Sequence, residues 1–269
     1  MRGLEGKNVL VTGGSSGIGQ AIAVRFAEYG ANVAINYLTT PEEAEGTEKM
    51  VHTCLEHVRR HDVKDVLVKG DVSREEDVIR MVEQTVGELG SIDVLVNNAG
   101  IQISRPSHEL SQADFEKVLA VNLRGAFLCA RESIKRFLDA GNGGVIVNIS
   151  SVHQDIPKPD YLGYSVSKGG MRNLTRTLAL EYAGQNIRIN AIGPGATITP
   201  INRAWVDDPE KAKLVTSHIP LGRAGTADEM AGITCFLASD DAAYITGQTI
   251  FVDGGLTLYA DFREPWSSE

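Results

Sequence analysis

The chain has 269 residues, of which 42% are hydrophobic and 23% are charged, as in an ordinary folded protein rather than a disordered one. Lysine and arginine number 26 and aspartate and glutamate number 35, so the formal charge is −9. A surface of this sign repels phosphate backbones and argues against nucleic acid as a partner.

The three cysteines are odd in number, lie far apart and have no CxxC or other metal-ligand spacing. We therefore predict reduced thiols, in the core or at the surface, and no metal site. The first residues lead almost directly into a strand-like segment, and no apolar stretch reaches the ~20 residues of a membrane span. The sequence predicts a cytoplasmic protein without a membrane partner.

Seven short runs rich in apolar and β-branched residues alternate with longer segments of helical spacing. The runs cover residues 8–12, 32–36, 65–69, 93–97, 144–150, 187–192 and 248–255. The helical segments cover residues 17–29, 73–87, 111–137, 164–183 and 226–237. Strand and helix in alternation predict right-handed crossovers, and hence a parallel sheet with helices on both faces. The fold class expected is α/β, with a single doubly wound, Rossmann-type domain and a seven-stranded parallel sheet across residues 1–269.

Residues 195–218 form the one long segment without regular spacing, and they include Pro200, Trp205 and Pro209. A loop of this length in a compact domain usually has a function, often as a lid. We predict a substrate lid here, and a C-terminal tail over residues 256–269.

The first strand runs into the sequence TGGSSGIG at residues 12–19, and a helix follows. Glycines in such a turn let the backbone approach a ligand, and the helix N-terminus offers free N–H groups to a pyrophosphate. The strand–turn–helix context predicts an NAD or NADP site, although a tight turn without a ligand has the same pattern. The turn contributes Gly13, Ser15, Ser16, Gly17, Ile18 and Gly19 to the predicted cofactor site.

The segment YSVSKGG sets Tyr164 and Lys168 four residues apart, about one helical turn. An ammonium beside a phenol favours the phenolate and lowers a pKa that is ordinarily ~10, which would give a general base. Such pairs also arise by chance in amphipathic helices, so the rest of the chain must decide.

Several motifs in one order resemble the short-chain dehydrogenase/reductase family. They are the glycine turn, the sequence NNAG at 97–100, Ser151 thirteen positions before Tyr164, the Tyr164–Lys168 pair and Pro194-Gly195. The resemblance spans residues 6–255. Within the family, the stretches 150–157, 192–202 and 254–262 are most similar to bacterial aldose dehydrogenases such as the glucose 1-dehydrogenases.

The resemblance implies four catalytic residues. Tyr164 would take the proton from a substrate hydroxyl while hydride leaves the same carbon for the nicotinamide, and Lys168 would lower the tyrosine pKa and bind the nicotinamide ribose. Ser151 would hold the reacting oxygen. Asn122 would support a water that leads protons away from Lys168, although spacing alone favours a helix-interior amide bonded to the backbone.

The resemblance also implies further cofactor contacts. Asp71 matches the carboxylate that binds adenine, with Val72 beside it, although a turn or a helix cap explains Asp71 equally well. Ser73 and Glu76 have the spacing of a capping box. The remaining implied contacts are Asn98, Ala99, Gly100, Pro194, Gly195, Thr197 and, for the nicotinamide, Ile192 and Thr199.

His153 and Asn202 match positions that contact sugar hydroxyls. A lone histidine is more often structural, but His153 lies at the carboxyl edge of the sheet, where α/β proteins bind ligands. Lys158 and Arg203 lie in the same two loops and could meet an anionic sugar, although solvated surface charge is the simpler explanation. Ser151 and Tyr164 complete the predicted substrate site.

The end of the second strand carries Asn36, Tyr37 and Leu38, all counted in the cofactor site. NAD sites usually have an acidic residue here and NADP sites a basic one. Asn36 takes the acidic position, while Leu38 and Ser16 are uncharged. Without a cation the sequence leans slightly toward NAD. The hydroxyls that could still bind a 2′-phosphate are those of Ser15, Thr39 and Thr40.

The sequence thus predicts an NAD(P)-dependent enzyme that oxidises an aldose at C1 to the lactone. The resemblance implies a homotetramer built through residues 111–137 and 164–183. One alternative is a carbonyl or 3-oxoacyl reductase of the same family; the tail, His153 and Asn202 favour the sugar enzyme. Another is a dinucleotide-binding regulator without chemistry, which the complete set of four catalytic residues argues against.

Overall fold

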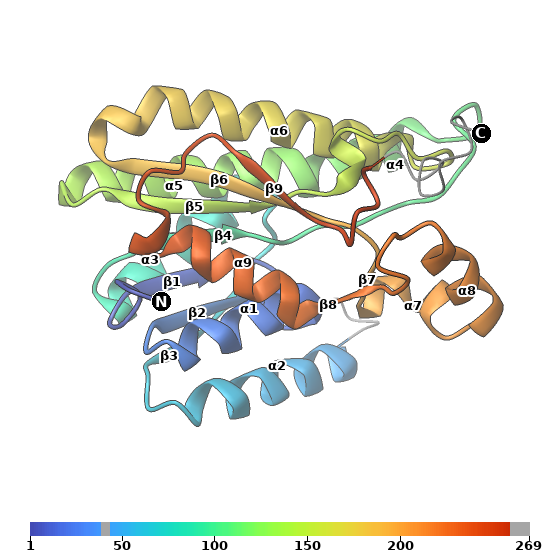
Figure 1. Cartoon of the computed structure of the whole chain (residues 1–269). Coiled ribbons are helices and arrows are strands. Elements are labelled where there is room, and N and C mark those ends of the chain that lie inside the picture. Colours follow the sequence, from blue (N-terminus) through green and yellow to red (C-terminus); the bar gives the residue numbers. More distant parts are fainter. Residues whose placement is uncertain (39–43, 259–269) are drawn as a thin grey trace, which may run out of the picture.

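The computed structural model describes residues 1–38 and 44–258, and in them seven parallel strands form one sheet in the order β3-β2-β1-β4-β5-β6-β9. The predicted doubly wound, seven-stranded α/β fold is confirmed (Figure 1). The strands are β1 (Asn8–Val11), β2 (Asn32–Tyr37), β3 (Asp65–Lys69), β4 (Val94–Asn97), β5 (Gly144–Ile149), β6 (Ile187–Pro194) and β9 (Thr249–Val252).

Helices cover both faces of the sheet because successive strand residues point to opposite sides. Val9 and Val11 enter one core, with α1 (Gly17–Glu28), α2 (Ala44–Arg59) and α9 (Ala227–Ala238). Leu10, between them, enters the other core. The helices on that second face are α3 (Glu75–Leu89), α4 (Gln112–Leu119), α5 (Gly125–Ala140) and α6 (Leu162–Tyr182).

Helix α2 is absent from the sequence-based prediction. Its buried side chains Cys54, Leu55 and Val58 have helical spacing and pack into the α1 and α9 core. The periodic signal was therefore present, in a short stretch otherwise rich in charge and histidine.

The segment 195–218 is not an irregular loop as predicted. It contains β7 (Thr197–Ile198), the 3₁₀ turn η4 (Pro200–Asn202), α7 (Arg203–Val206) and α8 (Pro209–Ser217), and β7 pairs with β8 (Gly225–Thr226). Asp208 caps α8 by accepting hydrogen bonds from the N–H groups of Glu210 and Lys211. An aspartate followed by proline is a helix-start signal. Helices α7 and α8 stand beyond the carboxyl edge of the sheet (Figure 1).

The predicted helical segment over residues 111–137 is present, but it is not a uniform α-helix. A π-helical turn, η1 (Ala120–Arg124), separates α4 from α5. Such turns insert an extra residue into the helical ladder and are frequent at functional sites. The other predicted elements lie where expected, with ends displaced by a few residues.

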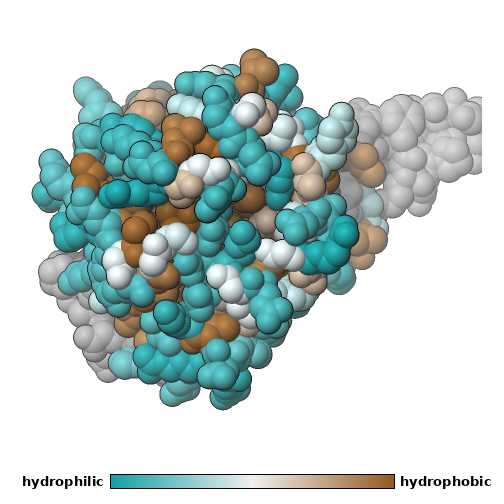
Figure 2. All heavy atoms as spheres, turned by 90° about the vertical axis from the view of Figure 1, so that its left-hand side faces the viewer, coloured by the Kyte–Doolittle hydropathy of each residue, from teal (hydrophilic) through white to brown (hydrophobic). Residues whose placement is uncertain are grey.

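The side of the molecule opposite α7 and α8 is mostly hydrophilic, with hydrophobic side chains scattered between polar ones (Figure 2). Cys54, Cys129 and Cys235 are all buried and unpaired, and burial raises the pKa of Cys54 and of Cys129 to about 12. Of the two predicted locations, the core and the surface, the cysteines therefore occupy the core. Among residues 1–38 and 44–258, no helix combines the length and apolar composition needed to cross a membrane.

Candidate active site

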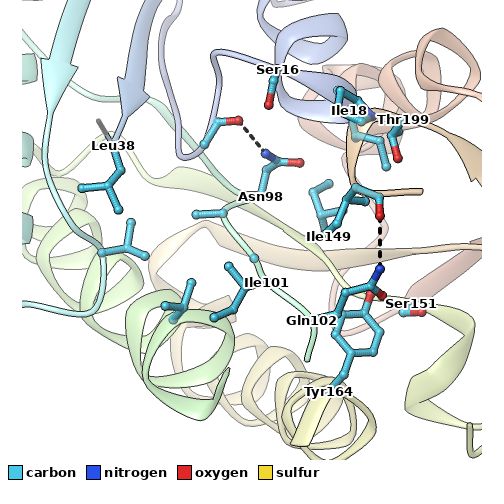
Figure 3. Close-up of a pocket in the computed structure, with 18 of the residues that line it drawn as sticks. Ser16, Ile18, Leu38, Asn98, Ile101, Gln102, Ile149, Ser151, Tyr164 and Thr199 are labelled. Carbon is cyan, nitrogen blue, oxygen red and sulfur yellow. Dashed lines mark hydrogen bonds between the residues drawn. The ribbon is translucent and has the colours of Figure 1, made fainter. Parts of the chain in front are cut away.

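A cavity of about 670 Å³ opens at the carboxyl ends of β1, β4, β5 and β6. The strand order reverses between β1 and β4, and in open α/β sheets ligands bind at such a switch point. The glycine turn forms one wall and α6 another, with η4 between them at the rim (Figure 3).

The glycine turn is built for close approach of an anionic ligand. Gly13 and Gly17 have φ of +59° and +55°, a region that other residues adopt with strain. A Cβ at Gly19 would lie 2.3 Å from the carbonyl oxygen of Gly13, so Gly19 allows the start of α1 to lie close against the turn. Ser16, the N-cap of α1, makes no capping hydrogen bond with its side chain, which leaves the helix N–H groups to a ligand. The turn therefore fits a dinucleotide pyrophosphate.

Ser151, Tyr164 and Lys168 meet at the α6 wall of this cavity. Ser151 is the second residue after β5 and hydrogen-bonds the Tyr164 phenol, and the two side chains lie side by side in Figure 3. Lys168 Nζ donates to the carbonyl oxygen of Ile149 at 2.7 Å and lies 5.5 Å from the centre of the Tyr164 ring. The expected grouping of these three residues is present in the structure.

Similarity to known proteins shows the family to which the chain belongs. Residues 13–257 match a family model described as enoyl-(acyl carrier protein) reductase. The chain is 51% identical to a glucose 1-dehydrogenase of Gluconobacter oxydans over 263 residues, which are 98% of this chain and 96% of the relative. The chain belongs to the short-chain dehydrogenase/reductase family. It is an NAD(P)-dependent oxidoreductase of that family.

Two other members of the short-chain dehydrogenase/reductase family show how widely their substrates differ. A 3β-hydroxysteroid dehydrogenase 1 of Eggerthella lenta is 43% identical over 97% of both chains. The crystal structure of a gluconate 5-dehydrogenase from Burkholderia cenocepacia, in complex with NADP and tartrate, is 34% identical. Its TM-score is 0.86, and the match covers 94% of this chain and 96% of that one.

Burial, and not Lys168, decides the direction in which the pKa of Tyr164 moves in this dehydrogenase, and the lowering expected from Lys168 stays a prediction. Burial raises the pKa of the Tyr164 phenol, and the hydrogen bond to Ser151 offsets this only in part. Burial also lowers the pKa of Lys168 to about 8. The Lys168 ammonium is taken out of water, which disfavours its charged form, and its hydrogen bond to the carbonyl of Ile149 does not reverse this.

Asn122 does not line the cavity of this dehydrogenase. It lies buried in η1, where its Oδ1 accepts from the N–H of Ile101 at 2.8 Å and its Nδ2 donates to the Ile101 carbonyl at 2.9 Å. Nδ2 also donates to Ser167 Oγ at 3.1 Å. This is the backbone-bonded amide that spacing alone favours, while a part in proton transfer stays a prediction.

Asp71 lines the cavity and also holds a turn. Its carboxylate accepts hydrogen bonds from the N–H and the Oγ of Ser73 at 2.8 and 2.7 Å. Ser73 is thereby kept from capping α3, which begins at Glu75, and the expected capping box with Glu76 is not formed. A turn and a contact with the cofactor are thus compatible roles for Asp71.

Asn36 faces the protein rather than a ribose. Its Oδ1 accepts from the N–H of Gly13 at 3.0 Å, and its Nδ2 donates to the carbonyls of Val68 and Gly70. The amide fastens the glycine turn to β3, so its donors are already used. The exposed residue at this end of the cavity is Leu38, and Thr39 and Thr40 lie outside the described residues.

Of the two residues predicted to contact only the substrate, one lines the cavity and the other does not. Asn202 lines it, but its Nδ2 donates to the Thr197 carbonyl at 2.9 Å. The His153 ring does not line it: its Nδ1 lies 2.9 Å from the Ile156 carbonyl, and its edge meets the Tyr164 ring with centroids 6.2 Å apart.

The two cations named beside the substrate residues differ from each other. Lys158 is not a solvated charge, because its Nζ lies 3.7 Å from the Tyr161 ring centre and burial lowers its pKa. Arg203 is exposed.

Most of the predicted cofactor and catalytic residues line one cavity, and a few do not. Those that line it are Gly13, Ser15, Ser16, Gly17, Ile18, Asn36, Leu38, Asp71, Val72, Asn98, Ala99, Gly100, Ser151, Tyr164, Lys168, Pro194, Gly195, Thr197, Thr199 and Asn202. Those outside its lining are Gly19, Tyr37, Asn122, His153 and Ile192.

Sequence reasoning missed several lining residues. Gln102 is the most informative, because its Nε2 donates to the Ile201 carbonyl at 3.3 Å and so connects the loop after β4 with η4 (Figure 3). Its position two residues after the NNAG motif was the available signal. Lys117 and Val121 lie four residues apart, on one helical face, and offered no other signal. The missed residues are Gly70, Ser73, Ile101, Gln102, Lys117, Ala120, Val121, Ile149, Ser150, Pro200 and Ile201.

Proposed function

We propose that the protein is an aldose 1-dehydrogenase that oxidises a glucose-like sugar at C1 to the lactone. The observation that carries this proposal is the Ser151–Tyr164 hydrogen bond in the wall of a cavity whose opposite wall is the glycine turn. Similarity to a glucose 1-dehydrogenase over nearly the whole chain supports an aldose as the substrate.

In the proposed mechanism, bound nicotinamide supplies the hydride acceptor, and the chain's own residues manage the proton. Ser151 would donate a hydrogen bond to the oxygen on C1, holding it beside Tyr164. Tyr164 Oη would take the proton from that hydroxyl. The pKa of Lys168 is about 8, so its ammonium is mostly charged at neutral pH. That positive charge would favour the phenolate form of Tyr164, which accepts the proton of the substrate hydroxyl.

A second candidate substrate is an alcohol with an apolar body. Ile101 and Ile201 both line the cavity, and Ile201 has 51% of its surface exposed. An exposed isoleucine at a cavity rim suits an apolar ligand better than a sugar. The relative that acts on 3β-hydroxysteroids favours the same choice. Reduction of 3-oxoacyl thioesters and regulation without chemistry are the two functions that compete with both candidates.

One substrate panel distinguishes these functions. Purified protein is mixed with NAD or NADP and with aldoses, a 3β-hydroxysteroid or a secondary alcohol, and the reduced cofactor is followed by its absorbance; a 3-oxoacyl thioester is tested with NADH and NADPH. We expect the highest kcat/KM with an aldose. A higher value with the steroid or thioester would replace the sugar assignment, and no turnover with any of them would favour the regulator.

Leu38 is expected to control the choice of cofactor, for which we propose a slight preference for NAD. The side chain is 50% exposed at the cavity and offers no charge to a 2′-phosphate. Leu38→Arg adds a cation that can bind phosphate with two hydrogen bonds. The ratio of kcat/KM for NADP to that for NAD should rise ~10- to 100-fold. Leu38→Gln, which is polar but uncharged, is the control, and an equal shift in that variant would contradict the role of charge.

We also propose that segment 195–218 closes over the bound ligands, although it is partly helical. Leu214 on α8 and Ile198 on β7 have 63% and 51% of their surfaces exposed. Closure would bury such side chains. The amides of α8 should therefore exchange more slowly when NAD(P) and an aldose are both present, as measured by hydrogen exchange, while those of α3 serve as the reference. Equal exchange in α8 with and without ligands would refute a lid.

The proposal includes a cytoplasmic homotetramer. Phe127 and Leu138 on α5 and Val166 and Leu180 on α6 are exposed, which gives these two helices apolar surface to bury between subunits. Light scattering by the purified protein tests the fourfold mass.

A further inference from the structure

A chain of buried hydrogen bonds crosses the sheet behind the catalytic residues. Asn97 on β4 donates to Asn148 Oδ1 on β5 at 2.9 Å, and Asn148 Nδ2 donates to Thr175 Oγ1 on α6 at 2.9 Å. Thr175 Oγ1 in turn donates to the Met171 carbonyl at 2.8 Å. Asn97, Asn148 and Thr175 are 3%, 1% and 0% exposed. None of the three lines the active-site cavity.

The chain of bonds joins the two elements that carry the catalytic residues. Thr175 follows Lys168 by seven residues and Tyr164 by eleven, which are about two and three turns of α6, so all three share a face. Asn148 precedes Ser151 by three residues at the end of β5. The Asn148–Thr175 bond therefore ties α6 to β5 directly below the site.

This bond constrains α6 in a way that its apolar contacts do not. Apolar packing is non-directional, whereas a hydrogen bond requires a particular distance and angle. Within the described part of the chain, Thr175 Oγ1 is the only acceptor of Asn148 Nδ2, and Asn97 Oδ1 has no partner. Loss of the Thr175 hydroxyl would leave a buried amide donor without a partner, which is unfavourable. A small shift of α6 or β5 would be the response.

We propose that Asn148 and Thr175 are positioning residues, which set the place of α6 against β5 and thereby the distance of Tyr164 and Lys168 from Ser151. The inference rests on the proposed function, in which these three residues act on the substrate hydroxyl. Asn148 and Thr175 are buried and contact no ligand, so they would affect the reaction only through the residues that they position.

The test replaces Thr175 with Val, which keeps the shape and removes the hydroxyl. A misplaced catalytic group lowers the rate steeply, so kcat should fall ~10- to 100-fold. The second readout is the pH profile, which depends on the groups near the Tyr164 ring. These are Ser151 after β5, His153 in the loop that follows, and Lys168 on α6. Because the hydrogen bond from Ser151 lowers the Tyr164 pKa, weakening that bond should shift the pH profile of kcat/KM to higher pH.

Two variants separate positioning from a general loss of stability. Thr234 on α9 is 0% exposed and donates to the Met230 carbonyl at 2.9 Å, the same helical bond as in Thr175 but without a described side-chain donor to it. Thr234→Val should lose comparable stability and keep the wild-type kcat and pH profile. Thr175→Ser retains the hydroxyl and should restore both. If Thr175→Val does not fold, Thr175→Ala must show the same fall and the same shift.

The outcomes distinguish this inference from the proposed function. The pKa of Tyr164 is measured without substrate, from the ultraviolet absorbance of tyrosinate in each protein minus that of the same protein with Tyr164→Phe. If no aldose is oxidised but Thr175→Val still raises this pKa, the positioning role stands and the aldose assignment falls. If an aldose is oxidised and Thr175→Val matches Thr234→Val in kcat, pH profile and Tyr164 pKa, the positioning role is overturned.

Discussion

Replacing Tyr164 with Phe is expected to lower kcat by at least ~10²–10⁴, the usual contribution of general acid–base catalysis. The variant keeps the ring, which packs against His153, and removes only the oxygen that would take the substrate proton. The glycine turn is untouched, so cofactor binding should be retained. Steady-state kinetics with the preferred sugar measure the first quantity, and fluorescence titration with reduced cofactor measures the second.

The matched control for this variant lies on the same helix. Tyr182 is the last residue of α6, far from the cavity, and Tyr182→Phe also removes one phenolic hydroxyl. Its kcat should equal that of the wild type. Near-normal turnover by Tyr164→Phe would show that another group accepts the proton. Equal losses in both variants would trace the effect to the helix rather than to Tyr164.

The strands were predictable because each is a short run rich in apolar and β-branched residues, as in NVLV of β1, which is entirely buried. The helices were less so. Residues of α2 and α8 were assigned to no helix, although Asp208-Pro209 is a start signal for α8. The π-helical turn at Ala120–Arg124 has no local signal. Within it, Asn122 hydrogen-bonds the backbone of Ile101, which lies 21 residues earlier in the chain.

The position of a site residue could be predicted where the residue belongs to a motif. Its hydrogen-bond partners and its pKa could not be predicted, because they depend on what buries it. Ser151, Tyr164 and Lys168 converge as their spacing implies. The occupied amide of Asn36 was not foreseeable, since its partners lie on β3. Neither was the pKa of Tyr164, because sequence spacing reports that Lys168 is one turn away but not that both groups are out of water.

Burial of Lys168 leads to the second prediction with a large effect. Lys168→Met should lower kcat as strongly as Tyr164→Phe and should also weaken cofactor binding, because the ammonium has two proposed roles. Steady-state kinetics measure kcat, and titration with reduced cofactor measures cofactor binding, as for Tyr164→Phe. A variant that lost turnover but bound cofactor as tightly as the wild type would contradict the contact with the ribose.

The same substitution should change how stability depends on pH. The folded-state pKa of Lys168, about 8, lies below its ordinary value of 10.5. Between these values the unfolded chain holds a proton that the folded chain does not, so this group makes the wild type more stable as pH rises through the window. Below it the folded protein carries the whole cost of a buried ammonium, on the order of 3 kcal/mol. Methionine has no proton to lose and therefore lacks this dependence.

Urea unfolding of both proteins at about pH 7 and about pH 10 isolates the effect, because every other titrating group is common to the two. The free energy of unfolding of the wild type minus that of Lys168→Met should increase between the two pH values. Lys69→Met, at an exposed position on β3, is the control and should give the same difference at both. If the difference for Lys168→Met is also constant, the lysine is not desolvated in the folded protein. Its pKa would then lie near 10.5, and its charge would stay available to Tyr164 well above neutral pH, as expected for the adjacent ammonium that the helical spacing alone predicts.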